Sequence, residues 1–250
     1  MSILSVVAIR VGSKGLQSKC TRKINSKATF EYVVEYSIDL NNWIKGGIFT
    51  VVSSDSDVVR EYCLRHDVLF LERSPQLTSD IARIEGVIYD AYCWVGKDFD
   101  YISLLYGNIP TRYPEEFVKA YNFLKENTDY DAVISMQNVE KYNPAWLFEL
   151  NEDVLSVKKE EGYRRQDLKQ YMVPDGHTIL VRNNHFLKFM AGNLPIKFMY
   201  AALGNKIKPM LNDKLIIDID TERDIELARS VLSFRCLESG GKFARREGMV

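Results

Sequence analysis

Residues 3–15 read ILSVVAIRVGSKG, an apolar run that gives way to a loop of glycine, serine and basic residues. The run from Ile3 to Ile9 predicts a β-strand buried on both faces, as in a parallel sheet. Ligands of open α/β sheets bind beyond the carboxyl ends of the strands, so the loop after such a strand commonly faces a ligand. This stretch therefore predicts an α/β fold with a binding loop directly after its first strand.

The rest of the chain alternates between apolar runs and amphipathic segments. Further strands are predicted at 48–54, 68–71, 101–106, 132–136, 177–181 and 214–219. Helices are predicted from Thr29 (a possible cap) to Leu40, at 55–66, at 81–95, from Pro114 onward, shortly after 181, and from Thr221 to about Ser233. Such alternation is typical of a mostly parallel central sheet flanked by helices. We expect a single domain over 1–233 and a loose tail over 234–250.

The alternation stops between about 137 and 175, where the chain is polar and aromatic. Strand and helix signals are mixed in this stretch. We interpret it as an insertion within the domain, either a lid or an arm that joins two copies of the chain.

Composition excludes several classes of protein. The chain carries 33 Lys and Arg against 34 Asp and Glu, a formal net charge of −1, whereas a protein that binds nucleic acid usually carries a basic surplus. No run approaches the ~18 apolar residues needed to span a bilayer. The N-terminus has neither the basic flank nor the small-residue cleavage site of a signal peptide. We therefore expect a cytoplasmic protein with neither a nucleic-acid nor a membrane partner.

Common zinc and hydrolase motifs are also missing from the sequence. The four cysteines show no C-x-x-C spacing, the three histidines no H-E-x-x-H, and no serine lies in a G-x-S-x-G elbow. The chemistry must therefore come from carboxylates, cations and loops.

The loop after the first strand combines glycines with three cations, Arg10, Lys14 and Lys19. Glycines such as Gly12 let backbone amides approach an anion, and fixed cations stabilise a leaving pyrophosphate. The loop matches neither a Walker A motif nor a dinucleotide fingerprint. It predicts a triphosphate site, with a solvated, mobile basic loop as the alternative.

A second candidate site lies in the stretch LIIDIDTERD, which carries Asp218 and Asp220 two residues apart. At the end of a strand, side chains with this spacing point to the same face. Two carboxylates suit Mg²⁺, which typically takes one or two of them together with substrate phosphate oxygens. The alternative is that Asp218 is a turn residue and Asp220 begins a helix, with Glu222 and Asp224 as capping residues.

Five motifs occur in the order found in the acylneuraminate cytidylyltransferases, the CMP-sialic acid synthetases. They are VVAIRVGSKGLQSK, RSPQLTSD, RRQDL, VPDG and IDIDTERD, and the resemblance runs from Val6 to about Ala228. It implies a Rossmann-like nucleotidyltransferase fold and a homodimer whose inserted arm contributes to the neighbouring site. It also implies Mg²⁺-dependent transfer of CMP from CTP to the hydroxyl of an acidic, sialic-acid-like sugar, a step in cell-surface polysaccharide biosynthesis.

The resemblance also assigns roles to individual residues. It implies that Arg10 and Lys19 bind the triphosphate beside Gly12, Ser13 and Lys14. Nucleotide contacts fall to Arg73, Ser79 and Asp80, contacts near the sugar and phosphates to Arg165 and Gln166, and metal binding to Asp218 and Asp220. Arg10, Lys19 and Asp218 are the catalytic candidates, and no covalent enzyme intermediate is required.

Departures from the family pattern gather on the acceptor side. Tyr106 stands where the family has a glutamine associated with acceptor binding, and Asn108 follows it in LLYGNIPTR. The usual P-N-G is Pro-Asp-Gly, so Asp175 adds negative charge, and His177 replaces a small residue. We take Tyr106, Asn108 and Asp175 as acceptor-binding candidates. Cys20 replaces an asparagine in the loop, where nearby cations would favour a thiolate; we interpret it as a tolerated replacement.

Three alternatives stay open. The chain could be a nucleotidyltransferase that activates a sugar phosphate or phosphonate, or a non-catalytic nucleotide-binding homologue. It could also be a glycosyltransferase that uses D-x-D to hold a nucleotide-sugar, which would not need the lysines of the first loop.

Overall fold

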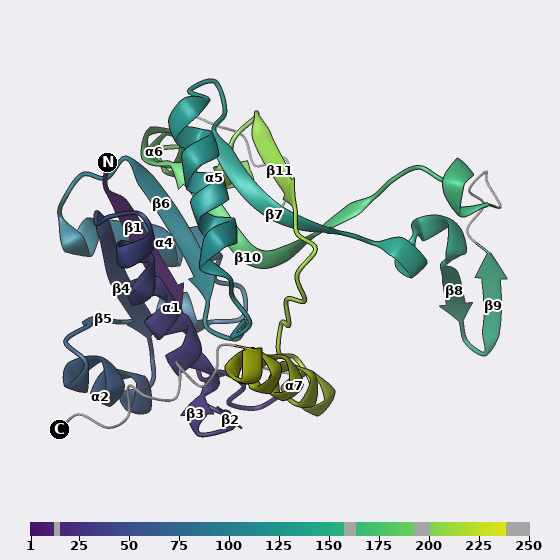
Figure 1. The fold of residues 1–250 in the computed structure, drawn as a ribbon, viewed down its shortest axis with the longest axis horizontal. Coiled ribbons are helices and arrows are strands. Elements are labelled where there is room, and N and C mark those ends of the chain that lie inside the picture. The colour runs from purple at the N-terminus through teal and green to yellow at the C-terminus, as the bar shows by residue number, and fades with distance from the viewer. Residues whose placement is uncertain (13–15, 158–163, 193–200, 239–250) are drawn as a thin grey trace.

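The computed structural model describes residues 1–12, 16–157, 164–192 and 201–238. They form a seven-stranded sheet covered by helices, with an arm projecting from one side (Figure 1). Its strands are β1 (Ile3–Ala8), β4 (Ile48–Ser54), β5 (Leu69–Glu72), β6 (Tyr101–Tyr106), β7 (Ala132–Asn138), β10 (Met172–Arg182) and β11 (Ile207–Leu211). Their order is β11-β7-β10-β6-β1-β4-β5, and all neighbours run parallel except β10, which is antiparallel to β6 and β7. The predicted α/β fold with a mostly parallel sheet is confirmed.

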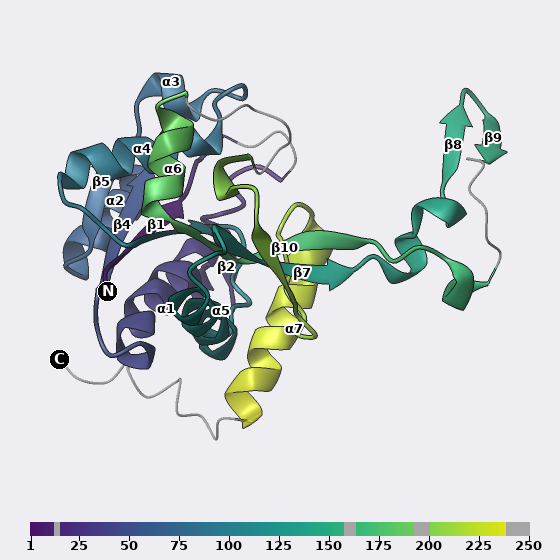
Figure 2. The same ribbon diagram turned by 90° about the horizontal axis from the view of Figure 1, so that it is seen from above.

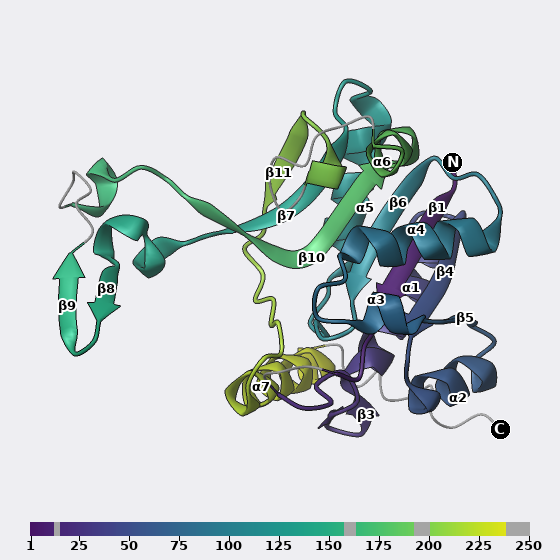
Figure 3. The same cartoon turned by 180° about the vertical axis from the view of Figure 1, so that it is seen from behind.

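Helices cover both faces of the sheet (Figures 2 and 3). One layer contains α1 (Thr29–Trp43), α2 (Asp57–Arg65) and α5 (Pro114–Glu126); the other contains α4 (Ile84–Val95), α6 (Asn183–Met190) and the short η4 (Ala201–Leu203). Alternate side chains of β1 enter different layers: Ile3 and Val7 join the first, Leu4 and Val6 the second. This alternation explains why the strand is apolar except for the buried Ser5.

One predicted strand is absent from the structure, and one observed strand of the sheet was not predicted. Residues 214–219 are extended but form no strand, and β11 takes the edge position instead. Pro209 fits an edge strand, since one side of such a strand needs no ladder hydrogen bonds. The run at 214–219 is apolar for another reason: Ile217 and Ile219 pack against α7 (Glu222–Glu238) in a third core.

Helix boundaries also differ. The predicted helix at 81–95 corresponds to α4, which begins three residues later, at Ile84. Ile81 lies in the segment between α3 (Pro75–Thr78) and α4, with 92% of its surface exposed. Thr29 is the first residue of α1 rather than its cap, and its hydroxyl donates to the Arg22 carbonyl at 2.9 Å. Helix α7 continues to Glu238, so residues 234–238 are helical rather than part of a loose tail.

The stretch between β7 and β10 forms the projecting arm (Figure 1). It contains η1 (Glu140–Tyr142), η2 (Pro144–Trp146), the hairpin of β8 (Phe148–Asn151) and β9 (Val154–Val157), and η3 (Arg165–Asp167). β7 and β10 run on into the arm, so both strands are longer than predicted.

The segment after β1 docks on the last helix. It contains the small hairpin of β2 (Lys23–Ile24) and β3 (Lys27–Ala28), and Ile24 packs with Ile225, Ala228 and Leu232 of α7. The third core thus holds the predicted phosphate loop against the helix that follows the acidic pair. Within the described residues, none of the helices is long and apolar enough to cross a membrane.

Candidate active site

The predicted cationic loop leaves β1 at its carboxyl end and is tied to its neighbours there. Arg10 forms an ion pair with Asp80, with 3.2 Å between Nη1 and Oδ1. The next amide, Val11 N–H, donates to Asp55 Oδ1 at 2.9 Å, directly after β4. Gly12 is exposed, whereas Ser13 and Lys14 lie outside the described residues. The structure therefore brings Arg10 and Asp80 together at the end of β1.

Lys19 reaches from this loop to the acidic pair. Its Nζ lies 2.6 Å from Asp220 Oδ1, and Arg22 pairs with Glu222 one step further along. Two pairs thus join the loop to the start of α7, and the predicted triphosphate cation lies beside the predicted metal carboxylate.

The two aspartates are close enough to influence each other. Partial desolvation and the negative charge of Asp220 raise the pKa of Asp218. Asp218 accepts a hydrogen bond from Asn108 Nδ2. Asp224 accepts from the amides of Asp220 and Thr221 at 3.1 and 2.8 Å, so it caps α7 as expected.

The donor set fits a magnesium ion that is completed by its substrate. Among the described residues, no group of three or more His, Cys, Asp or Glu side chains is arranged to hold a metal. Two carboxylates are nevertheless sufficient for Mg²⁺ when phosphate oxygens and water supply the other positions. Asp218 and Asp220 would hold such an ion.

Arg73 and Ser79 take up supporting positions. Arg73 is buried and donates to the Ser53 carbonyl at 2.8 Å and to the Ser53 hydroxyl at 3.3 Å, and burial lowers its pKa. The Ser79 hydroxyl donates to the Gln76 carbonyl at 3.0 Å. Arg73 thus contacts Ser53 near the carboxyl end of β4, and Ser79 directly precedes Asp80, which pairs with Arg10.

The cations near Cys20 do not lower the pKa of its thiol, which agrees with its interpretation as a tolerated replacement. Cys20 is buried, and burial raises the pKa of its thiol to about 11, which outweighs the opposing effect of Lys19. The sequence shows the neighbouring cations but not the burial. Cys20 is therefore a packing residue and is protonated at neutral pH.

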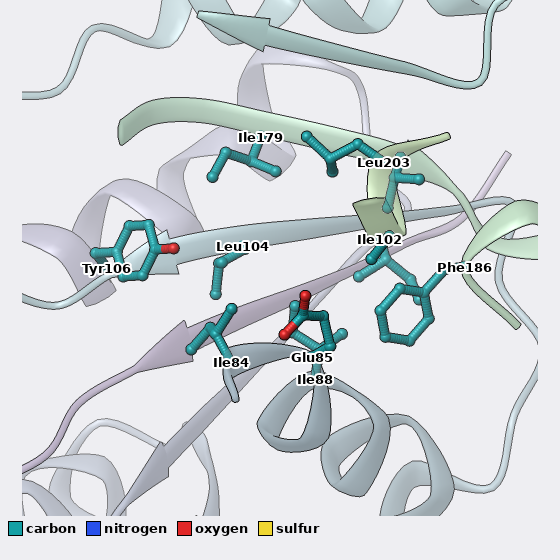
Figure 4. A pocket seen from close by; sticks show the side chains of 11 residues that line it. Ile84, Glu85, Ile88, Ile102, Leu104, Tyr106, Ile179, Phe186 and Leu203 are labelled. Carbon is teal, nitrogen blue, oxygen red and sulfur yellow. The ribbon is translucent and has the colours of Figure 1, made fainter. Parts of the chain in front are cut away.

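On the acceptor side, Tyr106 lies at the end of an apolar cavity of about 30 Å³ (Figure 4). The walls come from α4, β6, β10, α6 and η4, and include Ile88, Leu104, Ile179, Phe186 and Leu203. The Glu85 carboxylate points into this space and pairs with Arg83 at 2.7 Å. Neither Glu85 nor Arg83 was predicted, because an acidic residue in the first turn of a helix is normally read as a solvated residue.

Two other acceptor candidates have partners inside the chain. Asp175 accepts from the Ser135 hydroxyl, from His177 N–H at 2.9 Å and from Asn212 Nδ2 at 3.0 Å. Each of its carboxylate oxygens thus has a partner inside the chain, and contact with an acceptor stays a prediction. Asn108 is also turned inward, toward Asp218.

Arg165 and Gln166 belong to η3 on the arm. The arm extends away from the sheet in all three views, so a single chain does not bring η3 to the loop after β1 (Figures 1, 2 and 3). Gln166 is exposed. The structure describes the backbone of Arg165 but not its side chain.

Fold and site together define a protein of the nucleotidyltransferase class: a mostly parallel sheet with a cationic loop after its first strand and an acidic pair facing that loop. The chain belongs to the cytidylyltransferase family, since the family model described as "Cytidylyltransferase" matches residues 4–232. This confirms the relationship that the five motifs indicate.

Individual relatives and structures agree with this family. The N-acylneuraminate cytidylyltransferase of Streptococcus agalactiae serotype V is 27% identical over 191 residues, which cover 75% of this chain and 45% of that protein. The one of Escherichia coli O18:K1:H7 is 22% identical over 92% of this chain and 52% of its own length. The chain thus spans about half the length of these curated relatives. A structure of CMP:2-keto-3-deoxy-manno-octonic acid synthetase complexed with CTP has a TM-score of 0.68 at 15% identity, covering 94% of this chain and all of that one, and shows the shared fold.

Proposed function

We propose that this chain is a cytidylyltransferase that transfers CMP from CTP to a hydroxyl of an acidic, nonulosonate-like sugar and releases pyrophosphate. The observation that carries the proposal is the Lys19–Asp220 pair, which places a cation of the loop beside a carboxylate suited to Mg²⁺. A triphosphate and its metal need these two charges side by side.

The charged residues divide the work of an in-line displacement. The acceptor oxygen forms a bond to the α-phosphorus while the bond to pyrophosphate breaks, and negative charge gathers on the leaving group. Arg10 and Lys19 stabilise that charge, while the Asp55 contact to Val11 N–H fixes where the loop begins. Asp218 and Asp220 would hold Mg²⁺, which neutralises phosphate charge when bound.

The acceptor class is supported by the relatives, which are named as N-acylneuraminate cytidylyltransferases. The product would be an activated sugar, which fits a cytoplasmic step that supplies cell-surface polysaccharide synthesis.

We also propose that the protein works as a homodimer. The hairpin at the end of the arm exposes 69% of Leu150 and 63% of Leu155, which are directly opposite each other on β8 and β9. Exposed apolar side chains gathered on a projection are typical of a surface that another chain covers. A second copy would let Arg165 and Gln166 approach a neighbouring active site.

The test is pyrophosphate release with four nucleoside triphosphates and a panel of acceptors. The proposal expects strict dependence on CTP, on Mg²⁺ and on a nonulosonate. Activity with a sugar phosphate or phosphonate instead would favour the alternative nucleotidyltransferase. Calorimetry without detectable Mg-CTP binding would indicate a non-catalytic homologue.

A further inference from the structure

The loop that follows β6 holds the acidic segment in place. The Ile219 amide donates to the Asn108 carbonyl at 3.0 Å, and Asn108 Nδ2 donates to Asp218 and, at 3.4 Å, to the Ile219 carbonyl. The Ile217 amide donates to the Thr111 hydroxyl at 2.7 Å. Residues 217–219 are therefore fixed by the loop rather than by strand pairing, which they lack.

A buried arginine closes this loop from within. Arg112 is 4% exposed and donates to the carbonyls of Tyr106 at 3.2 Å, Ile109 at 3.1 Å and His177. Its guanidinium carbon lies 5.7 Å from the centre of the Tyr36 ring. In the described part of the chain it forms no ion pair, and burial lowers its pKa to about 10. The charge is compensated by three carbonyl dipoles, one from the last residue of β6, one from the loop and one from β10.

The same arginine is connected to the far end of α7. Arg235 Nη1 donates to the Arg112 carbonyl at 2.9 Å, and its guanidinium carbon lies 3.5 Å from the centre of the Tyr113 ring. The acidic pair lies just before α7, so this loop holds the segment on both sides of Asp220. A displaced loop would therefore displace both carboxylates.

We propose that Arg112 is a positioning residue for the metal-binding aspartates, acting through Asn108 and Thr111. The inference rests on the proposed function for the identity of the ligands, but the tether itself is independent of them. Lysine cannot replace the arginine, because an ammonium is a compact charge and lacks the planar fork that reaches three carbonyls.

The chain provides a matched control in Arg182. It also donates to three backbone carbonyls, those of Tyr130, Leu124 and Asn127, at 2.7, 2.5 and 3.1 Å. Its guanidinium carbon lies 5.4 Å from the Tyr101 ring centre. Arg182 ends β10 and does not contact the acidic segment. Arg182→Lys should therefore lower the stability of the fold about as much as Arg112→Lys does, but without displacing Asp218 and Asp220.

The experiment compares CTP binding by calorimetry with EDTA and with Mg²⁺, in wild type, Arg112→Lys and Arg182→Lys. In wild type, adding Mg²⁺ should increase the affinity for CTP. In Arg112→Lys this increase should be at least about tenfold smaller, as is typical when a group that orients metal ligands is removed. Its metal-free CTP affinity should stay within twofold of wild type. Arg182→Lys should keep the full gain. An unchanged gain in Arg112→Lys, or equal losses in both variants, would overturn the proposal.

Two further measurements keep the outcome interpretable. Hydrogen exchange in the ligand-free protein should be faster at the Ile217 and Ile219 amides in Arg112→Lys but not in Arg182→Lys; equal protection would contradict the tether even if CTP is not the ligand. If Arg112→Lys does not fold, Thr111→Val removes one tether at nearly constant volume and should lose part of the Mg²⁺-dependent gain. A wild type that shows no Mg²⁺ effect would refute the proposed function, whereas the exchange result decides the positioning role.

Discussion

Lys19 Nζ lies 2.6 Å from Asp220 Oδ1, although 201 residues separate the two in sequence. In the ligand-free chain a cation suited to phosphate and a carboxylate suited to metal neutralise each other. CTP alone would bind Lys19 and leave Asp220 without a cation. Mg²⁺ alone would bind Asp220 and leave Lys19 without an anion. Both ligands together satisfy both side chains, so each should strengthen binding of the other to the same extent.

Asp220→Asn tests this coupling. Free of its partner, Lys19 should bind CTP in EDTA up to about fivefold more tightly, since an exposed ion pair is worth at most ~1 kcal/mol. The increase in affinity on adding Mg²⁺ should largely disappear. Calorimetry with and without Mg²⁺ measures both effects. Asp129→Asn, which breaks the Lys206 pair at the opposite end of the sheet, should change neither. Weaker metal-free binding in Asp220→Asn would contradict the exchange of partners.

Asp218→Asn should lower kcat at least about a hundredfold, because the metal ion loses a charged ligand. Stability should not fall. The pKa of Asp218 is raised in the folded chain, so at neutral pH its ionised form favours the unfolded state, and removing the charge removes that effect. Steady-state kinetics and thermal unfolding at pH 7 check the two expectations. Near-normal Mg²⁺-dependent activity would remove Asp218 from the metal site.

The sequence predicts the strands of the central sheet best where burial on both faces favours a mostly apolar run. Residues 48–54 and 101–106 match β4 and β6 to the residue. The rule fails at 214–219, because an apolar run can equally serve a core outside the sheet, and at β11, whose Lys208 and Pro209 give no strand signal. Motif spacing locates Arg10, Lys19 and the two aspartates for a similar reason: their chemistry is local to the motif.

Burial and long-range partners are the properties that the sequence does not contain. Cys20 follows a lysine, yet desolvation decides its pKa. Asn108 has the chemistry of an acceptor-binding side chain, but its partner is an aspartate 110 residues away. Arg112 looks like a solvated loop cation until the loop is seen to close around it. Each outcome depends on which segments the fold brings together.

Tyr106 should control the acceptor and not the nucleotide. Tyr106→Gln restores the residue that the family pattern has there, and Tyr106→Phe removes only the hydroxyl. We expect Tyr106→Gln to change kcat/KM at least tenfold for some acceptors in a panel, while KM for CTP stays within twofold. Ile3→Val, buried in the core on the opposite face of the sheet, is the control: it should cost about 1 kcal/mol of stability and leave acceptor preference unchanged. Equal changes in KM for CTP and acceptor would contradict this division.

His177 should make stability depend on pH. Its Nε2 accepts from Tyr113 N–H at 2.7 Å, which places the proton on Nδ1, beside the Thr178 hydroxyl. Burial and the charges of Arg112 and Arg235 hold its pKa well below 6.5. The folded chain therefore keeps His177 neutral where the unfolded chain binds a proton, so stability is lost as pH falls below about 6.5, by up to ~1.4 kcal/mol per pH unit.

Urea unfolding between pH 7.5 and 5 measures that slope. His177→Gln should be less stable at pH 7.5 and should show a shallower loss toward pH 5. His66→Gln, at an exposed histidine, should retain the wild-type slope. Parallel curves for wild type and His177→Gln would show that His177 titrates alike in both states.

The arm gives the last prediction, because its hairpin presents apolar side chains that its own chain does not cover. Leu150 and Leu155 face each other across β8 and β9. Leu150→Glu with Leu155→Lys keeps the hairpin paired through opposite charges but makes its surface polar. Light scattering should show twice the chain mass for wild type and a single chain for the double variant. Activity should fall with dimer content, because Arg165 and Gln166 would no longer reach a neighbouring site. Leu64→Glu, at a leucine of α2 that is 73% exposed, should leave both mass and activity unchanged. A wild type that is monomeric and active at assay concentration would refute the role of the arm.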